Sequence, residues 1–182
     1  MKRPGAAAAM AACLLAGAAL SADPVPEPLG YRMEGYRAPV PATIEGGEVV
    51  GTAQARALLE AGETLFIDVL PRPPKPEGLP EGTIWRDKPR RTIPGAVWLP
   101  DIGYGAISPE TDAYFRENLA RLTGSRDTPV LFFCLAECWM SWNAARRAIW
   151  EYGYTRVYWY PDGTDGWSAA GFPLERSAPV PR

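Results

Sequence analysis

The chain has 182 residues, with 19 lysine and arginine residues against 21 aspartate and glutamate residues, and a net charge of −2. This balance offers no basic surface for nucleic acid. The sequence has no histidine, which excludes a Ser-His-Asp triad, a Cys-His dyad, a histidine metal ligand and a Cys-x-x-Cys-His haem attachment site. Its chemistry must therefore rest on thiols, carboxylates, arginines, tyrosines or backbone dipoles.

Residues 1–22 have the pattern of a secretory signal peptide. Lys2 and Arg3 are followed by an apolar run over 6–20 and by small residues up to Ala22. The run is too short to favour a stable membrane span. We therefore expect cleavage near Ala22, which leaves 17 basic residues against 21 acidic ones.

Export changes the expected chemistry of the cysteines. Cleavage removes Cys13 and leaves Cys134 and Cys138. Lipidation of Cys13 is an alternative, but few apolar residues precede it. Two cysteines four residues apart in an oxidising compartment are expected to be oxidised at least part of the time. They are too few for a structural zinc site, so we expect no metal.

Residues 23–47 are rich in proline, glycine and glutamate and are typical of an extended arm. Tyr31 and Tyr36 are the side chains expected to hold it on the domain. A second proline-rich stretch, the insertion 70–91, excludes a helix or a central strand. Its length suits a lid, a partner surface or a stiff surface loop.

Between and after these stretches, strand patterns alternate with helix patterns. The expected elements are a helix over 53–61, a strand over 64–69, a turn and short strand within 93–100, a helix over 112–122, a strand over 129–134, a helix over 142–152 and a strand over 156–160. Thr52 is expected to cap the first helix and Gly62 to end it. Asp162 and Gly163 indicate a turn. The alternation predicts an α/β domain with a central, mostly parallel sheet flanked by helices.

The segment 130–148 carries the most informative pattern. An apolar run ends at Cys134, a short loop contains Cys138, and a helix-like segment rich in alanine and arginine follows. Backbone N–H groups at a helix start and the helix dipole both favour an anionic sulfur at this place.

Three interpretations of the pair remain open. Cys134 is an activated nucleophile that takes a persulfide, or the two cysteines form a reversible disulfide, or they form a structural one. At this spacing the Cα atoms of Cys134 and Cys138 could lie about 5–6 Å apart, within bonding range. A structural disulfide closing so small a ring would add about 2 kcal/mol by the chain-entropy model. Hydrolytic thiol chemistry is disfavoured because no histidine base exists.

Other side chains near the loop are candidates for contact with a ligand or cofactor. Trp139 could shield the sulfur or present a flat surface to a quinone. Glu137 places a negative charge in the loop, and Arg146 or Arg147 could point toward it, with at least one of them exposed to solvent. Asp68 ends a strand near the same sheet edge, and we expect it to accept backbone hydrogen bonds in a structural role.

Five segments in order resemble a rhodanese-like domain over residues 49–175. They are Ile67-Asp68-Val69, Ile93-Pro94-Gly95-Ala96, Cys134 with Ser141-x-x-Ala144-Ala145, Gly153-Tyr154-x-x-Val157-Tyr158, and Asp162-Gly163-x-x-x-Trp167-x-x-Ala170-Gly171-x-Pro173. The resemblance implies a rhodanese-like α/β domain over 48–176, followed by a tail over 177–182. It also implies that Cys134 carries a persulfide during sulfur transfer.

The chain departs from ordinary members of that family. Leu70 stands where an arginine usually follows Asp68-Val69, and Thr92 stands where a histidine usually precedes Ile93. The loop is one residue longer, and Trp139 or Met140 falls where an arginine usually binds the anionic sulfur donor. These differences disfavour efficient thiosulfate:cyanide transfer.

The Cys134-x-x-x-Cys138-Trp139 motif, together with the export signal, narrows the resemblance. It is similar to periplasmic rhodanese-like proteins associated with alcohol oxidation that depends on pyrroloquinoline quinone (PQQ). The resemblance implies thiol-disulfide or cofactor-linked redox work, with a quinoprotein dehydrogenase or a c-type cytochrome as partner. Two other classes remain open: a sulfurtransferase with a Cys134 persulfide, and a non-catalytic binding or assembly protein that docks through residues 70–91.

Overall fold

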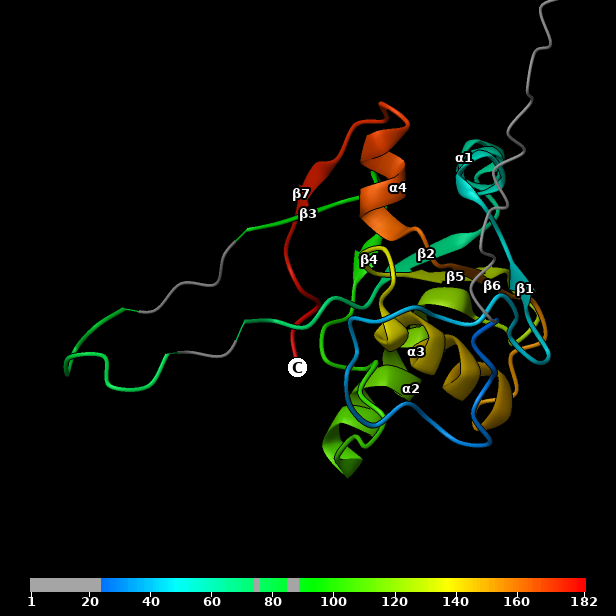
Figure 1. The fold of residues 1–182 in the computed structure, drawn as a ribbon. Helices are drawn as coiled ribbons and strands as arrows, with labels where there is room; N and C mark the ends of the chain where they lie inside the picture. Colours follow the sequence, from blue (N-terminus) through cyan, green and yellow to red (C-terminus); the bar gives the residue numbers. More distant parts are fainter. Residues whose placement is uncertain (1–23, 74–75, 85–88) are drawn as a thin grey trace, which may run out of the picture.

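The computed structural model describes residues 24–73, 76–84 and 89–182 (Figure 1). The predicted signal peptide, including Cys13, lies outside these residues, as do parts of the insertion 70–91. Within the described ranges, no helix combines the length and apolar character needed to cross a bilayer.

Five strands form the central sheet in the order β1-β6-β5-β2-β4. Their bounds are Glu48–Val49 for β1, Leu65–Asp68 for β2, Val97–Trp98 for β4, Val130–Phe133 for β5 and Val157–Tyr160 for β6. All four pairings are parallel, which confirms the predicted α/β class. The central strand β5 is an unbroken apolar run because both faces of a parallel sheet are covered.

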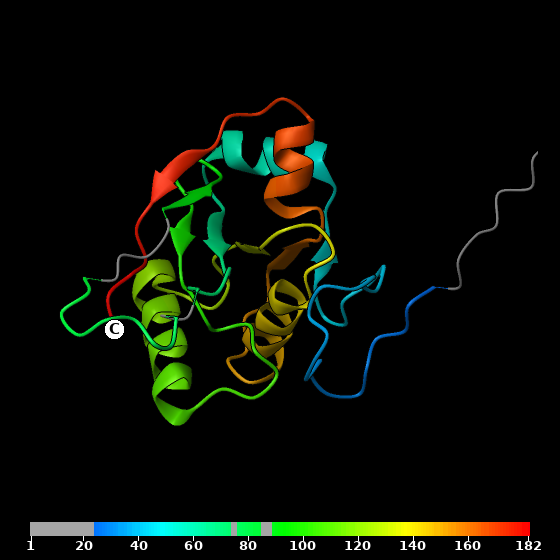
Figure 2. The same ribbon diagram turned by 60° about the vertical axis from the view of Figure 1, so that its left-hand side comes forward.

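Two helices cover each face of this sheet. Figures 1 and 2 show α1 (Thr52–Ala61) and α4 (Gly163–Ala169) on one face, with α2 (Pro109–Thr123) and α3 (Trp139–Trp150) on the other. Alternate residues of β5 divide between the two cores: Phe132 packs on the α2/α3 side and Phe133 on the α1/α4 side. Cys134 continues this alternation into the α2/α3 core.

The first helix begins one residue earlier than expected. Gly62 ends α1 in the left-handed conformation with φ 72°, as predicted. Thr52 is not its cap, because Gly51 occupies that position and Thr52 is already helical. The Thr52 hydroxyl instead makes a 2.8 Å hydrogen bond with the hydroxyl of Tyr160, which joins α1 to β6.

Two other helices also begin before their predicted starts. α2 begins at Pro109, because Ser108 caps it by accepting a hydrogen bond from the Thr111 N–H. α3 begins at Trp139 rather than Trp142, so Trp139 is a helical residue and not a loop residue. The expected turn at Asp162 and Gly163 is instead the start of the short helix α4.

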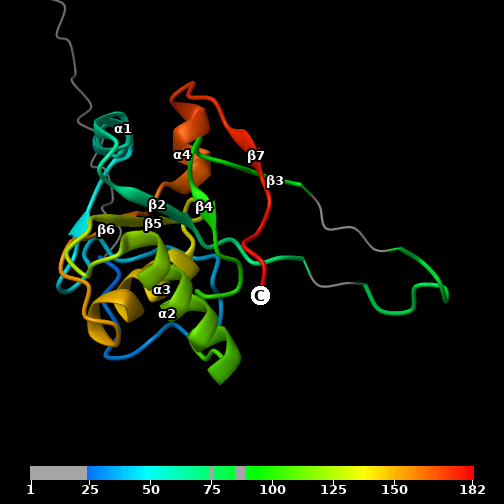
Figure 3. The same cartoon turned by 180° about the vertical axis from the view of Figure 1, so that it is seen from behind.

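A second, two-stranded sheet was not predicted. β3 (Arg90–Thr92) pairs antiparallel with β7 (Glu175–Ser177) beyond the β4 edge. β3 is formed by the end of the insertion, whose described residues 76–84 lie away from the central sheet (Figure 3). After β7 the tail makes a parallel bridge from Pro179 to Trp98, which covers the edge of the central sheet.

The arm packs along α3 and is attached at several points (Figure 1). Asn143 holds Arg32 with two hydrogen bonds, accepting from its N–H at 3.0 Å and donating to its carbonyl at 2.9 Å. The Tyr31 hydroxyl donates to Glu151, and Tyr36 packs edge-on against Tyr104. Both tyrosines therefore hold the arm on the domain, as expected.

Candidate active site

The two cysteines meet at the carboxyl edge of the sheet. Cys134 directly follows β5, and Cys138 is the N-cap residue of α3. Their Sγ atoms lie 2.7 Å apart, and both are free thiols in this structure. Cys134 is 0% exposed and Cys138 is 3% exposed. The strand-loop-helix turn, residues 134–138, therefore brings both sulfurs together; we call it the cysteine loop.

The cysteine loop stabilises a negative charge on Cys138. The hydrogen bond with Cys134 lowers the pKa of the Cys138 thiol to about 7, helped by the N–H groups of Met140 and Leu135 and opposed by burial. Met140 lies in the first turn of α3, where free N–H groups attract an anion. Glu137 adopts the left-handed conformation with φ 50°, which forms the backbone concavity just before the helix.

The pKa of the Cys134 thiol is shifted in the opposite direction. Burial raises the pKa of its thiol well above the usual value, and the hydrogen bond and charge of Cys138 and the charge of Asp68 raise it further. Cys138 is therefore the thiol that ionises first. Cys134 keeps its proton at pH values where Cys138 is already ionised.

A buried ion pair lies behind the cysteine loop. Asp68 accepts hydrogen bonds from Arg90 Nε at 2.7 Å, from Thr92 Oγ1 at 2.6 Å and from the Leu70 N–H at 3.0 Å. Burial raises the pKa of the Asp68 carboxyl, and the charge and hydrogen bonds of Arg90 oppose this. Asp68 thus accepts a backbone bond as expected, and it also neutralises an arginine that the sequence did not single out.

The ion pair is linked to Cys134 through α4. Arg90 Nη2 donates to Thr164 Oγ1 at 3.3 Å, and the Thr164 N–H donates to the Cys134 carbonyl at 3.0 Å. Gly163 makes this approach possible: its φ is 51°, and a Cβ there would lie 2.4 Å from the Cys134 carbonyl oxygen. The end of β5 is therefore fixed by α4 as well as by the sheet.

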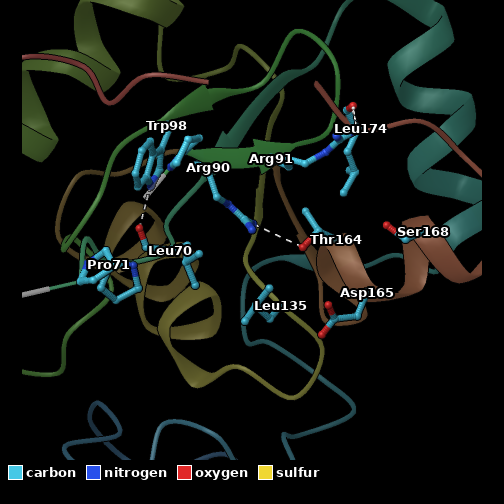
Figure 4. A pocket seen from close by; sticks show the side chains of 12 residues that line it. Leu70, Pro71, Arg90, Arg91, Trp98, Leu135, Thr164, Asp165, Ser168 and Leu174 are labelled. Atoms are coloured by element: carbon cyan, nitrogen blue, oxygen red, sulfur yellow. Dashed lines mark hydrogen bonds between the residues drawn. The ribbon is translucent and has the colours of Figure 1, made fainter. Parts of the chain in front are cut away.

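A cavity of about 400 Å³ lies beside the cysteine loop. Figure 4 shows the polar side chains of Arg90, Thr164 and Asp165 around it, together with the apolar side chains of Leu70 and Leu135. Leu135 belongs to the loop, whereas neither cysteine lines the cavity. The cavity is therefore next to the thiol pair but closed off from it in this conformation.

The family model of the rhodanese-like domain matches residues 52–170, more than half of the chain. The chain belongs to the rhodanese-like domain family.

Solved structures with similar folds include a thiosulfate sulfurtransferase from Pseudomonas aeruginosa, with a TM-score of 0.49 and 19% identity over 73% of this chain and 21% of that chain. A second is the polysulfide-sulfur transferase homodimer from Wolinella succinogenes, with a TM-score of 0.45 and 17% identity over 71% of this chain and 79% of that chain. No curated protein matches the chain.

Within this rhodanese-like domain, the predicted contact residues do not all reach the thiols. Glu137 is exposed in the cysteine loop. Trp139 is 2% exposed, donates its indole N–H to the Pro39 carbonyl at 3.1 Å and packs edge-on against Trp142. Its ring therefore lies under the arm and offers no open flat surface beside the sulfurs.

Neither helix arginine is directed to the cysteine loop. Arg146 pairs with Glu27 of the arm at 3.4 Å and lies over the Trp150 ring. Arg147 donates to three backbone carbonyls, those of residues 102, 104 and 105. The expectation that at least one is exposed is wrong, because both are buried against the arm and the loop before α2.

The sequence pointed to Arg146 or Arg147 as the arginine of the thiol pair, and the structure instead places Arg37 of the arm there. Arg37 forms an isolated antiparallel bridge with Cys138, and its charge contributes to lowering the Cys138 pKa. Across the described ranges, no cluster of three or more cysteine, aspartate or glutamate side chains is placed to hold a metal ion.

Proposed function

We propose that this chain is a thiol-disulfide redox protein in which Cys138 attacks and Cys134 resolves. The observation that carries the proposal is the contact of the two sulfurs at 2.7 Å, with Cys138 at the N-terminus of α3. A thiolate is the nucleophile in disulfide exchange, and a helix N-terminus is a place where it is stabilised.

The proposed disulfide exchange takes place in two steps. The Cys138 thiolate attacks one sulfur of a partner disulfide, forms a mixed disulfide and releases the partner's other sulfur as a thiolate. That thiolate takes a proton from Cys134, and the Cys134 sulfur then attacks Cys138 Sγ. The bond between Cys134 and Cys138 forms, the second partner sulfur leaves as a thiolate that takes its proton from water, and two electrons pass from the pair to the partner.

Sulfur transfer with a persulfide on Cys134 is the second candidate. It is supported by membership in the rhodanese-like family and by the position of Cys134 at the end of the central strand. The sulfur of Cys138 lies in contact with that of Cys134. It would therefore attack a persulfide on Cys134 and displace its outer sulfur, so we place this candidate second.

The cellular setting is also a proposal. The signal-like pattern of residues 1–22 supports export to the periplasm, and the Cys134-x-x-x-Cys138-Trp139 motif supports a link to PQQ-dependent alcohol oxidation. A quinoprotein dehydrogenase or c-type cytochrome is then the proposed partner. Since Trp139 is buried under the arm, contact with such a partner is proposed to run through the thiols.

The intact mass of the exported protein, alkylated in denaturant before and after reduction so that buried thiols react, tests the proposal. We expect no alkyl group to add before reduction and two to add afterwards, with no extra sulfur, because neighbouring thiols oxidise in such a compartment. An extra sulfur atom would instead support the persulfide candidate. Two thiols that alkylate without reduction would favour the assembly role, in which deleting residues 76–84 should do more harm than replacing Cys138.

A further inference from the structure

We infer that Arg37, carried by the N-terminal arm, is a positioning residue of the thiol site and that the arm is a working part of this site. The inference rests on the proposed role of Cys138 as the attacking thiol. It assigns to the arm the cation that the cysteine loop itself lacks.

The backbone places Arg37 directly opposite Cys138. The Trp139 N–H donates to the Tyr36 carbonyl at 2.9 Å, and the Ala38 N–H donates to the Glu137 carbonyl at 3.2 Å. These two bonds flank the bridge, so Arg37 and Cys138 form a non-hydrogen-bonded antiparallel pair. In such a pair the side chains leave the same face at their closest spacing. The Arg37 side chain therefore starts beside the Cys138 sulfur.

Contacts on both sides of the bridge hold the arm in this place. Before the bridge, the Tyr36 hydroxyl accepts a hydrogen bond from the Gly105 N–H at 3.1 Å, and Arg32 is held by Asn143. After the bridge, the Pro39 carbonyl accepts the Trp139 indole N–H. The position of Arg37 is therefore fixed by packing and backbone bonds that do not depend on its own side chain.

The charged side chains around the Cys134 and Cys138 thiols indicate an electrostatic role for Arg37. Three carboxylates surround the cysteine loop. The charge of Asp68 of β2 acts on Cys134, Glu137 lies exposed in the loop itself, and Asp165 of α4 accepts the Ala136 N–H. Arg90 is paired with Asp68 at 2.7 Å. Arg37 Nη2 lies 4.0 Å from Asp165 Oδ2, the same oxygen that accepts the Ala136 N–H at 3.0 Å.

Arg37 therefore balances the negative charge at the open side of the cysteine loop. Its guanidinium lies at the surface, half exposed, while its backbone covers Cys138. Arg37 thus supplies both a positive charge and the backbone that covers Cys138. A substitution that removes only the charge separates the electrostatic effect from the effect of the backbone.

The test is a pH titration of the thiolate, followed by its ultraviolet absorbance in the reduced protein. The Cys134→Ser/Cys138→Ser double variant serves as the blank. For the natural chain the thiolate signal should rise with pH through a midpoint of about 7. For Arg37→Gln the midpoint should move upward by about half a unit to one unit, because a nearby positive charge favours the ionised thiol. Arg37→Lys keeps the charge and should titrate like the natural chain.

Added salt should reduce the difference between the natural chain and Arg37→Gln, because the guanidinium is half exposed. The thermal midpoints of the variants should stay close to that of the natural chain, since the backbone bridge remains. If the natural chain titrates with a midpoint of about 7 and Arg37→Gln titrates with the same midpoint, this inference is overturned and the proposed function is left intact. A natural midpoint near that of an ordinary thiol would instead count against Cys138 as the attacking group.

Discussion

Replacing Cys138 by serine is expected to slow the first step of disulfide exchange at least about tenfold at pH 7, since even an ordinary thiol is ionised to only a few per cent there. With a pKa of about 7, roughly half of Cys138 is ionised there. Burial raises the pKa of the Cys134 thiol well above the usual value, so this thiol stays almost wholly protonated at pH 7, and only the thiolate attacks. The measurement is the rate of thiol release from a small chromogenic disulfide.

Cys134→Ser is the matched variant and should behave differently. Its Cys138 can still attack, so a mixed disulfide with the partner should accumulate because no resolving thiol is present. Serine keeps a hydrogen-bond donor beside Cys138. The opposite order, with Cys134→Ser inactive and Cys138→Ser active, would contradict the assignment and support a Cys134 persulfide.

Replacing Asp68 by alanine is expected to lower the free energy of unfolding by about 3–5 kcal/mol. Asp68 is 0% exposed and Arg90 is 9% exposed, so the change leaves a buried guanidinium without its partner. Thr92 loses its acceptor as well. The measurement is the midpoint and slope of a urea unfolding curve of the reduced protein.

A matched control is available on α1. Glu60 pairs with Arg56 at 2.6 Å, but this pair is exposed, and Glu60→Ala should cost less than about 1 kcal/mol. The double variant Asp68→Leu/Arg90→Met should recover part of the loss, because it removes both charges together. An Asp68→Ala protein as stable as the Glu60→Ala protein would show that the buried pair does not hold the site.

The central sheet could be predicted because its signals are local. Apolar runs such as 130–133 alternate with helix patterns, and Gly62 ends α1 as expected. The antiparallel pair β3 and β7 could not be predicted, since its two strands lie more than eighty residues apart and carry charged residues typical of a loop. The start of α3 was missed because Cys138 caps it without a side-chain hydrogen bond.

Only part of the candidate site could be predicted from the sequence. Cys134 and Cys138 followed from the strand-loop-helix pattern, and the structure places their sulfurs in contact. The division of roles that we propose for them could not be predicted from the sequence, because it rests on burial at the end of β5 and on N–H groups of the folded loop. No sequence signal pointed to Arg37, because its contact with Cys138 joins residues 101 positions apart.

The reduction potential of the Cys134 and Cys138 pair is the most direct test of the redox proposal. The protein would be equilibrated in glutathione buffers of graded composition, and its thiols trapped by acid and alkylated. A reversible, redox-active pair predicts a potential less negative than about −300 mV. A pair that stays oxidised at potentials more negative than about −300 mV would be a structural disulfide, and the proposed exchange chemistry would be wrong.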